Sequence, residues 1–554
     1  MSQSSEDHHF LSLLKPVLLD KREALIFRPY IGSCPGFQWG TVTFGEFDHH
    51  LAASAKHWGE ALENSGFKSR DIIGVWLTGS KYEDLINILG ICAAGYVPQL
   101  FSVAFTPHII RDLVSRSGAK GLVYDSAFTS QVNSSSSSVP LFPSVPVGVL
   151  ENNSHFGRTL GTLPSVVEKD TAFVVHSSGT TSGTPKIIPA NHLWVKTFIQ
   201  SKWASSLEQG TFEGQTVVNS IGSLAHVGSL CGKHVNNGNL VQQMKLASAF
   251  LGAAYCGSCT VQSSALDAST SELLGMISTC GLNRVALYAT FLSTHIRAAR
   301  TNPEVLHALK CMRQILHTGV ALNREDEEWA LHHALPLTTM YGTSETSPLL
   351  TSLLGNDPSD RLLRPVHGAS GQLIPAIPSS EDGSRPAMFE MVVPSDAPDS
   401  PHSSFFSADG FYHTGDLFEE VEKGSFVFRG RSNDWIKTVR GFCDTKSMED
   451  IVRKACGDLI KDVVVVGLNR PRPVLMVEIS DKTLSGMERH EIAEEIIARL
   501  APHNERLFTH ERIDDPKRIL VLEEGNLPRT KEKGNIRRNA TEEKYAKDVD
   551  AIFA

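Results

Sequence analysis

The sequence lacks the features of disulfide-rich, zinc-binding and nucleic-acid-binding proteins. Only nine of the 554 residues are cysteines, and they are scattered singly along the chain. Cys256 and Cys259 have CxxC spacing, but no second pair or pair of histidines lies near them, so we expect structural or buried thiols and no zinc site. The formal net charge of −9 comes from 52 basic and 61 acidic residues without long blocks of one sign, which excludes a basic surface for nucleic acid.

Long hydrophobic runs are also absent. The first ten residues, MSQSSEDHHF, carry acids and histidines where a secretory signal needs a basic end followed by an apolar run. The most apolar stretch, residues 85–97, is interrupted by Asn87, Gly90 and Gly95 and is too short to cross a bilayer, so it predicts a buried helix. We therefore predict a cytoplasmic protein with no membrane span, a small-molecule substrate and no nucleic-acid partner.

What is present is typical of a large globular protein. The hydrophobic fraction of 41% and the charged fraction of 20% are ordinary, and the chain is too long for one hydrophobic core. Residues 40–125 alternate helix-like stretches such as 47–65 with short β-rich runs such as 71–77 and 121–124, which predicts an α/β fold. The serine run at 133–138 predicts an exposed loop.

The last ~120 residues have their own alternation of strands and helices, within the usual size of a domain. They contain the β-rich stretches 424–429, 462–468 and 473–479 and the helix-like stretch 489–500. We predict a boundary near Arg431.

One segment changes character sharply. Residues 171–189, TAFVVHSSGTTSGTPKIIP, contain an apolar β-branched run, a loop of serine, threonine and glycine, a lysine and a second apolar run. Such a loop can surround phosphate oxygens with backbone N–H groups, hydroxyls and an ammonium. It lacks the spacing of a Walker A loop, and a flexible surface loop is the alternative explanation of the segment taken alone.

The loop does not stand alone, because its text SSGTTSGTPK at 177–186 resembles the phosphate loop of the adenylate-forming superfamily. That superfamily includes acyl-CoA synthetases, firefly luciferases and the adenylation domains of peptide synthetases. Further signatures follow in the family's order: MYGTSETSP at 340–348, GFYHTGDLF at 410–418, GRSNDWIKTVRG at 430–441 and LPRTKEKGNIRR at 527–538. An ordered series of this kind is far more specific than any single match.

The resemblance implies a fold and a reaction. The fold is α/β, with a large N-terminal adenylate-forming domain of sheets packed with helices (1–430) and a smaller, mobile α+β domain (431–554). The reaction joins ATP to an organic acid as acyl-AMP, releases pyrophosphate with the help of Mg²⁺, and passes the acyl group to a thiol. The enzyme would be a carboxylate-adenylating ligase.

The resemblance also assigns roles to individual residues. Glu345 is implied as the Mg²⁺ ligand, Asp416 as the acceptor of the ribose hydroxyls with help from Arg431, and Tyr341 as a neighbour of adenine. The full set of implied nucleotide-binding residues is Ser177, Ser178, Gly179, Thr180, Thr181, Ser182, Gly183, Lys186, His317, Thr318, Gly319, Tyr341, Gly342, Ser344, Asp416, Phe428, Arg431 and Lys437. The alternative for Glu345 is an ordinary acidic residue on the surface, and the alternative for Lys437 is a lysine on the surface of a helix.

The catalytic lysine and the acyl pocket are assigned in the same way. Lys533 matches the lysine that bridges the carboxylate and the α-phosphate, although it precedes Gly534 where the family has Gly-Lys, so Lys531 remains a competitor. His226 falls at the mouth of the implied acyl pocket, where a packed structural histidine is the alternative. Asn433 falls at the hinge position, where relatives carry aspartate.

The acid is expected to be aryl or aliphatic. Residues 286–292, ALYATFL, should approach the pocket and are mainly apolar with two aromatics. The aspartate that holds the ammonium of an α-amino acid in peptide-synthetase domains has no evident counterpart, which argues against such a substrate.

The identity of the thiol stays open between coenzyme A and the phosphopantetheine of a carrier domain. The segment GFCDTKSMED at 441–450 and the Lys-Gly order resemble the adenylation domains of fungal peptide-synthetase-like carboxylic acid reductases. No carrier motif or Rossmann glycine signature follows Arg538, so we do not expect this chain alone to reduce an acid. A nucleotide-binding protein without turnover is the alternative function.

Overall fold

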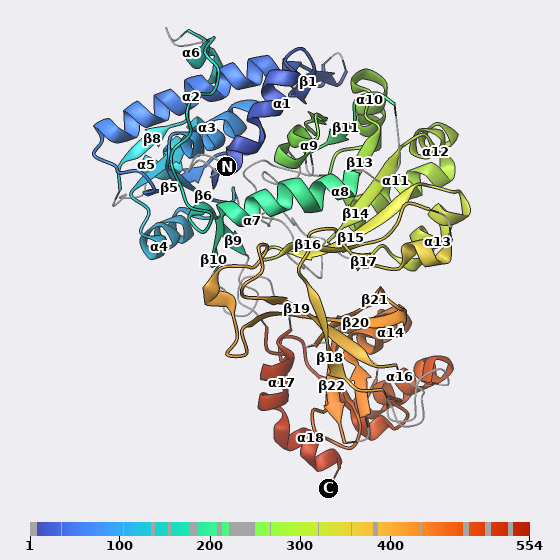
Figure 1. Ribbon diagram of the computed structural model, residues 1–554. Helices are drawn as coiled ribbons and strands as arrows, with labels where there is room; N and C mark the ends of the chain where they lie inside the picture. Colours follow the sequence, from blue (N-terminus) through green and yellow to red (C-terminus); the bar gives the residue numbers. More distant parts are fainter. Residues whose placement is uncertain are drawn as a thin grey trace.

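The computed structural model (Figure 1) describes most of the chain, in a series of ranges separated by gaps. These ranges are 8–34, 36–103, 105–133, 139–152, 157–177, 185–207, 213–220, 250–265, 267–319, 321–355, 357–379, 386–432, 435–439, 441–479, 487–504, 511–529 and 536–553.

A six-stranded sheet with the order β10-β9-β6-β5-β7-β8 forms the first layer of the N-terminal body. Its strands are β5 (Ile72–Trp76), β6 (Val97–Leu100), β7 (Gly121–Tyr124), β8 (Leu141–Pro143), β9 (Thr171–Ser177) and β10 (Lys186–Asn191). The inner strands are parallel, and only β10 runs antiparallel to its neighbour. The predicted strands at 71–77 and 121–124 are confirmed.

The helices α2 (Phe44–Asn64), α3 (Tyr82–Ala93) and α4 (Pro107–Ser117) accompany this sheet. A capping box starts α2, in which Thr43 and Glu46 satisfy each other's backbone N–H groups. Helix α3 is buried at all of its positions except Glu83, as a helix that is apolar on every side should be. This confirms the buried helix predicted at 85–97 over residues 85–93, whereas Val97 begins β6.

A nine-stranded sheet with the order β17-β16-β15-β14-β13-β11-β12-β1-β4 lies beside the first. Its strands are β1 (Leu25–Arg28), β4 (Val42–Thr43), β11 (Val217–Asn219), β12 (Cys259–Val261), β13 (Arg284–Tyr288), β14 (Gln314–Thr318), β15 (Leu337–Thr343), β16 (Ser347–Thr351) and β17 (Arg364–Pro365). Strands β13, β14 and β15 are parallel, so their carboxyl ends lie at one edge. Helices α10 (Thr270–Cys280), α11 (Ala289–Thr301), α12 (Pro303–Lys310) and α13 (Arg324–His332) enclose an apolar core on this sheet.

A four-stranded antiparallel sheet extends from this body. Its strands are β18 (Gln372–Ile377), β19 (Met388–Pro394), β20 (Phe411–Glu422) and β21 (Ser425–Arg431). Met391 and Phe418 from this sheet pack in one cluster with Leu349 and Leu350 of β16. The cluster fixes the two sheets against each other near the end of β15.

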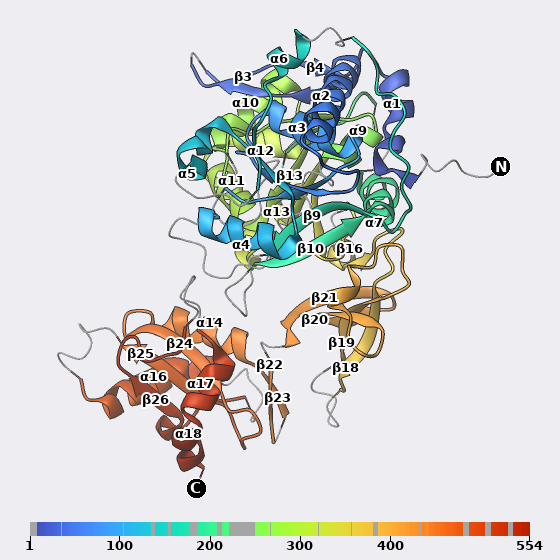
Figure 2. The ribbon, with the colours of Figure 1, turned by 90° about the vertical axis from the view of Figure 1, so that its left-hand side faces the viewer.

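The C-terminal part, from β22 onward, lies below the N-terminal body in Figure 2. It contains β22 (Trp435–Thr438), β23 (Gly441–Asp444), α14 (Thr445–Cys456), β24 (Ile460–Val466), β25 (Val474–Ile479), α16 (Arg489–Asn504), β26 (Ile519–Leu522), α17 (Arg538–Lys544) and α18 (Ala546–Ile552). The valines of β24 and β25 alternate between two apolar clusters, one with α14 and α16 and one with α18. The predicted boundary near Arg431 falls between β21 and β22 and stays a prediction.

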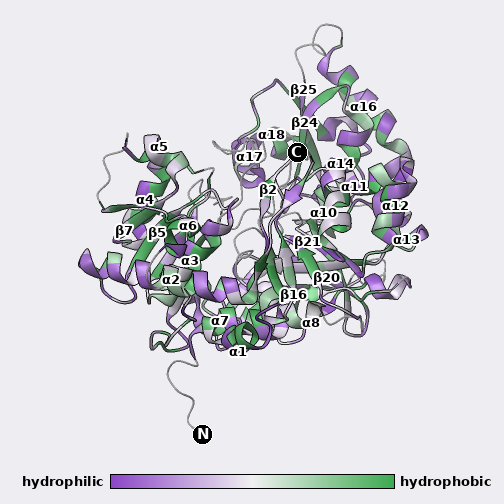
Figure 3. Ribbon diagram, turned by 90° about the horizontal axis from the view of Figure 1, so that it is seen from above, coloured by the Kyte–Doolittle hydropathy of each residue, from purple (hydrophilic) through white to green (hydrophobic). Residues whose placement is uncertain are grey.

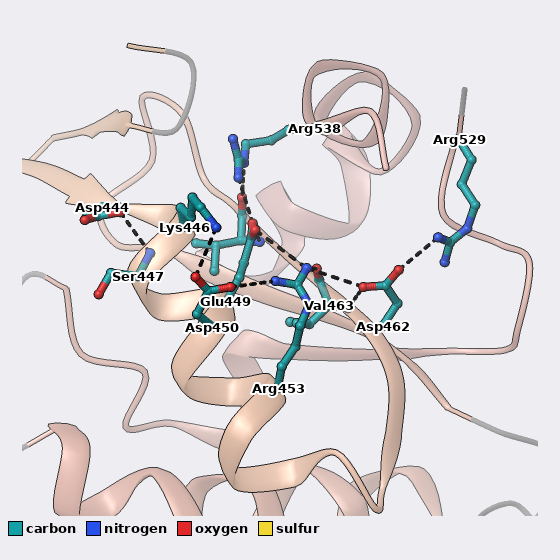
Figure 4. A network of polar contacts seen from close by, with 11 residues as sticks. Asp444, Lys446, Ser447, Glu449, Asp450, Arg453, Asp462, Val463, Arg529 and Arg538 are labelled. Atoms are coloured by element: carbon teal, nitrogen blue, oxygen red, sulfur yellow. Dashed lines mark hydrogen bonds and ion pairs between the residues drawn. The ribbon is translucent and has the colours of Figure 1, made fainter. Parts of the chain in front are cut away.

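Charged side chains hold the last segments of the chain to α14 and to the C-terminal sheet (Figure 4). Arg538 donates to Glu449 Oε1 at 2.8 Å, and Arg529 binds Asp462 Oδ2 at 2.9 Å and also the buried Glu478. The backbone N–H of Arg537 donates to the carbonyl of Pro528 at 2.8 Å. The chain is therefore fixed both at 528–529 and at 537–538.

Hydrophobic residues concentrate on the strands, and hydrophilic residues colour the outer faces of helices such as α12 and α13 (Figure 3). No helix within the described ranges is long and apolar enough to cross a membrane.

Cys259 is buried but Cys256 is exposed, so the expectation of a buried thiol is wrong at Cys256, which lies in the turn after a short helix.

Candidate functional site

The residues predicted to surround a nucleotide gather where β14 and β15 end. His317 and Thr318 are the last residues of β14 and pair in register with Thr339 and Met340 of β15. His317 Nε2 lies 2.8 Å from Thr339 Oγ1, and Thr318 Oγ1 donates to the carbonyl of Met340 at 2.8 Å. Burial lowers the pKa of His317 to about 4, so its imidazole is neutral near pH 7.

Gly319 allows the chain to leave β14 close to an aromatic ring. Its φ of +94° lies in the region that favours glycine, and a Cβ there would stand 2.8 Å from Cδ1 of Tyr288. Tyr288 belongs to the segment 286–292, which comprises the end of β13 and the start of α11. The structure thus brings 317–319 against the segment predicted to approach the acid.

Tyr341, Asp416 and Arg431 form a connected group across two sheets. The Tyr341 hydroxyl donates to Asp416 Oδ2 at 2.7 Å, and Arg431 Nε lies 3.0 Å from Asp416 Oδ1. Phe428 lies beside them, its ring centroid 6.0 Å from that of Tyr341. Burial, with the Asp416 carboxylate adding to it, raises the pKa of Tyr341 well above its ordinary value, so the hydroxyl keeps its proton.

A β-bulge in β20 presents Asp416. The register with β19 shifts between Glu390 and Val392, opposite residues 414–416, and Gly415 has a φ of +72°. Thr414 Oγ1 donates to the carbonyl of Met391, and the N–H of Gly415 donates to Glu390 Oε1 at 3.0 Å. The Thr-Gly-Asp text is therefore a bulge whose backbone is held by the neighbouring strand.

Glu345 sits in the turn 344–346 between β15 and β16. Its side chain is half-buried, and within the described part of the chain its carboxylate has no ion pair or hydrogen bond. Its charge helps to raise the pKa of Tyr412, after burial as the main cause. Glu345 and Ser344 line a small cavity together with residues 188–191 of β10, Trp194 and residues 400–401.

This environment fits a divalent cation. A carboxylate without a cationic partner, next to hydroxyl groups and facing a cavity, is the oxygen donor that Mg²⁺ prefers. Among the described residues, no cluster of three or more His, Cys, Asp and Glu could hold a metal ion by itself. Glu345 would therefore share Mg²⁺ with water and ligand oxygens, as is usual for this ion.

The two ends of the predicted phosphate loop are fixed by strand pairing. Ser177, the last residue of β9, pairs with Lys186, the first residue of β10. Lys186 is exposed, and its ammonium lies 6.0 Å from the centroid of the Phe405 ring. The predicted nucleotide-binding residues between them, Ser178, Gly179, Thr180, Thr181, Ser182 and Gly183, lie outside the described ranges, but β10 leads directly to the cavity of Glu345.

Other predicted residues lie apart or outside the description. Lys437 is an exposed residue of β22, so the alternative of a helix surface is wrong, and its ammonium lies 5.8 Å from the centroid of the Phe442 ring. His226, Asn433, Lys531 and Lys533 fall outside the described ranges. Their roles stay predictions.

Sequence reasoning missed several residues that shape the site. Glu390 holds the bulge before Asp416, Tyr412 lies near Glu345, and the buried pair Lys202–Asp399 holds the turn after Glu345. Tyr412 could have been noticed, because it stands inside the GFYHTGDLF text. The other three carry no local signal, since their partners are distant in sequence.

Family models match both parts of the chain. A model described as "AMP-binding enzyme" covers residues 20–377, and one described as "AMP-binding enzyme C-terminal domain" covers residues 443–554. The AMP-binding domain-containing enzyme iboA of Amanita muscaria (strain Koide BX008) is 32% identical over 542 residues, which are 96% of this chain and 100% of that protein.

Solved structures share the fold at lower identity. The o-succinylbenzoate coenzyme A synthetase MenE of Bacillus subtilis, in complex with AMP, is 19% identical with a TM-score of 0.65, over 95% of this chain and 97% of that one. ATP-bound MatB of Rhodopseudomonas palustris is 17% identical with a TM-score of 0.67, over 97% and 99%. Together with the ordered motifs and the site they form, these matches establish that the chain belongs to the AMP-binding enzyme family of the adenylate-forming superfamily.

Proposed function

We propose that this enzyme activates a carboxylic acid with ATP, forming acyl-AMP and pyrophosphate, and then transfers the acyl group to a thiol. The observation that carries the proposal is the connected group Tyr341–Asp416–Arg431, together with Glu345, which faces a cavity shared with β10. Family membership supports the adenylating half of the reaction.

Asp416 has the capacity to hold a ribose. Its Oδ2 accepts a hydrogen bond from Tyr341, and its Oδ1 lies in an ion pair with Arg431. The two neighbouring hydroxyls of a ribose are donors of the kind that a carboxylate accepts. Arg431 and Tyr341 thus hold the carboxylate in place, and a carboxylate forms charge-assisted hydrogen bonds with hydroxyl groups.

The neutral residues on β14 suit an adenine ring. His317 is buried and uncharged, Thr318 is fixed to β15, and the backbone of Gly319 packs closely against the Tyr288 ring. A flat ring can lie against such a backbone without meeting a charged side chain. The rings of Tyr341 and Phe428 give it a second apolar wall.

Glu345 would hold Mg²⁺ near the phosphates. When bound, Mg²⁺ neutralises the charge that grows on the leaving pyrophosphate. The predicted phosphate loop, residues 177–186, is proposed to bind the same oxygens, and its ends are fixed by the β9–β10 pair.

Lys533 is proposed as the residue that aligns the acid with the α-phosphate. We expect Lys533→Ala to suppress adenylate formation far more strongly than Lys531→Ala, because Lys533 lies next to Gly534. Rates of acyl-AMP formation for the two variants test this. Equal losses, or a larger loss for Lys531→Ala, would overturn the assignment.

The acid and the thiol are proposed at the level of chemical class. The apolar segment 286–292 favours an aryl or aliphatic acid over an α-amino acid. Coenzyme A is one candidate thiol, since a structure with the same fold bears the name of a coenzyme A synthetase. The phosphopantetheine of a carrier domain, as in the reductases that residues 441–450 resemble, is the other.

Acid-dependent exchange of labelled pyrophosphate into ATP tests the proposal. We expect exchange with one or more members of a panel of aryl and aliphatic acids, and a strong loss of exchange in Glu345→Gln. Purified protein with ATP, the active acid and coenzyme A then shows whether acyl-CoA forms without a carrier domain. Absence of exchange across the panel, with ATP still bound, would instead favour a nucleotide-binding protein without turnover.

A further inference from the structure

Lys202 is a completely buried lysine, and three acceptors surround its ammonium. It lies in η4 (Phe198–Trp203), a π-helical turn between α7 (His192–Thr197) and α8 (Ala204–Leu207). Its Nζ donates to Asp399 Oδ2 at 2.7 Å, to the carbonyl of Thr346 at 2.8 Å and to Ser347 Oγ at 2.9 Å. Each of the three N–H bonds of the ammonium therefore has an acceptor.

Asp399 balances this charge from another part of the chain. It is 1% exposed, and its Oδ2 also accepts the backbone N–H of Ser370 at 3.0 Å. Burial lowers the pKa of Lys202, and the Asp399 carboxylate opposes that shift. The next residues, 400–401, line the cavity that Glu345 faces.

The turn that Lys202 contacts has an unfavourable backbone conformation. Ser347 has a φ of +62°, in the left-handed region that L-residues other than glycine, asparagine and aspartate seldom adopt. A Cβ on Gly342 would collide with the Ser347 carbonyl, so the two arms of the turn approach as closely as backbone allows. Strained turns persist where the surroundings hold them, and Lys202 contacts both residues that follow Glu345.

π-Helical turns are rare and occur often at functional sites, because the extra residue redirects a side chain. Here η4 directs a lysine into the interior, toward residues 346–347. For stability alone such a pair offers little, since apolar residues of similar volume usually replace buried ion pairs without loss. Apolar residues, however, cannot donate hydrogen bonds to a carbonyl and a hydroxyl.

We propose that Lys202 is a positioning residue, which fixes the turn 344–347 through Thr346 and Ser347 so that the Glu345 carboxylate is set to receive the magnesium ion of the nucleotide. This inference rests on the proposed function, because it takes Glu345 as the Mg²⁺ ligand. Lys202 itself touches neither the metal nor the substrate.

The test compares three variants of the full chain. Lys202→Met removes the hydrogen bonds to Thr346 and Ser347 and leaves the buried Asp399 carboxylate without its ion pair. The double variant Lys202→Met/Asp399→Asn removes the same hydrogen bonds and both charges, which keeps the protein testable if the single variant fails to fold. Lys81→Met is the control for an unpaired buried carboxylate, because it removes the ion pair of Asp125, which is 3% exposed and lies outside the turn; Lys81 itself is 43% exposed.

The readout is the affinity for ATP measured by titration calorimetry with Mg²⁺ and with EDTA, beside the melting temperature of each protein. Loss of a residue that orients a metal ligand typically weakens metal binding by about 10- to 100-fold. We expect the gain in ATP affinity from Mg²⁺ to fall by about tenfold or more in both Lys202 variants and to persist in Lys81→Met. The double variant should recover melting temperature without recovering the Mg²⁺ effect.

Two outcomes would overturn the inference. One is a folded double variant whose ATP affinity responds to Mg²⁺ as strongly as that of the unmodified chain, which would make the pair a feature of the fold alone. The other is an unmodified chain whose ATP affinity ignores Mg²⁺. Failure of the proposed function is distinct from both, since it appears as no acid-dependent exchange although Mg²⁺ still tightens ATP binding.

Discussion

At the scale of single residues, the two carboxylates of the candidate site have different surroundings. Asp416 is 3% exposed, yet it binds a tyrosine hydroxyl and an arginine, which meets the cost of burying an ionised group. Glu345 differs, because it is half-buried and faces a cavity. These two environments suit the roles proposed for them, a sugar-binding carboxylate at Asp416 and a cation-binding carboxylate at Glu345.

Asp416→Asn should weaken ATP binding while keeping the shape of the side chain. Hydrogen bonds to a charged group contribute about 1.5–3 kcal/mol, so we expect the KM for ATP in the exchange reaction to rise by roughly tenfold or more. Tyr341→Phe is the control, since it removes the hydroxyl that turns Asp416 but leaves the carboxylate, and its effect should be smaller. Equal effects of the two substitutions would contradict the role of the Asp416 charge.

The histidine three residues before Asp416 predicts a dependence of stability on pH. Hydrogen bonds with Asp409 and Glu390 raise the pKa of His413 above its ordinary 6.5. A raised pKa in the folded state means that the protonated histidine stabilises the fold fully below pH 6.5, and that this contribution is lost as the pH rises through the raised value. The difference in melting temperature between the unmodified chain and His413→Gln should therefore be larger at pH 6 than at pH 9.

A second background isolates the ion pairs of His413. Introduced into Asp409→Asn, the same His413→Gln substitution should show a weaker pH dependence, because the partner with the largest effect is gone. An equal difference in melting temperature at both pH values would show that His413 does not titrate between them.

At the scale of elements, the turn 344–347 depends on close backbone packing, and Gly342→Ala tests it. The added Cβ would collide with backbone atoms of Ser347, which cannot move aside as a flexible side chain would. Overpacking of this kind costs about 1–3 kcal/mol, so we expect a loss of this size in urea unfolding and a loss of pyrophosphate exchange.

Gly148→Ala is the matched control for that substitution. Gly148 lies in the short helix α6 (Val147–Glu151), and a Cβ there meets nothing within 4 Å. Alanine in a helix is favoured over glycine by about 0.5–1 kcal/mol, so stability should rise slightly or stay the same. If Gly342→Ala also left stability unchanged, the backbone of the turn could shift to accommodate a Cβ, contrary to this prediction.

The sequence predicted several elements well because their signals are local. The alternation of apolar runs gave the strands at 71–77 and 121–124, and the apolar text of 85–97 gave a buried helix. The bulge at 414–416 could not be predicted, since it depends on the register with β19 and on Glu390. The left-handed Ser347 could not be predicted either, because serine rarely adopts that conformation without tertiary support.

The candidate site shows the same division. Motif text located Tyr341, Glu345, Asp416 and Arg431, and the structure brings the first, third and fourth into direct contact. Lys202 was missed because nothing in its neighbourhood marks a lysine that points inward from a helical turn. Its role appears only when β16 and residue 399 are placed beside it.

At the scale of the whole molecule, the C-terminal part has a core of its own. Valines of β24 and β25 fill clusters on both faces of the sheet, with α14 and α16 on one side and α18 on the other. Trp435 and Phe442 are exceptions, because they pack against Ile377, Met388 and Leu417 of the larger body. The boundary predicted near Arg431 stays a prediction, and β22 and β23 link the larger body to the core of the C-terminal part.

Residues 435–554, expressed alone, should fold. We expect a cooperative thermal transition, and Ile496→Ala in this fragment should cost about 2–5 kcal/mol, because Ile496 is completely buried between α16 and the sheet. Circular dichroism in the near and far ultraviolet measures both. A broad transition without near-ultraviolet signal would show that the fragment depends on the larger body.

The buried contact between Lys202 and Asp399 has an evolutionary consequence. A homologue that loses the lysine keeps an acid with no counterion, and one that loses the acid keeps an isolated ammonium, so single replacements at either position should be selected against. Homologues should then carry both residues or neither. Those with neither should show, at 342–347, a sequence that forms the same loop by other means, such as a glycine in place of Ser347.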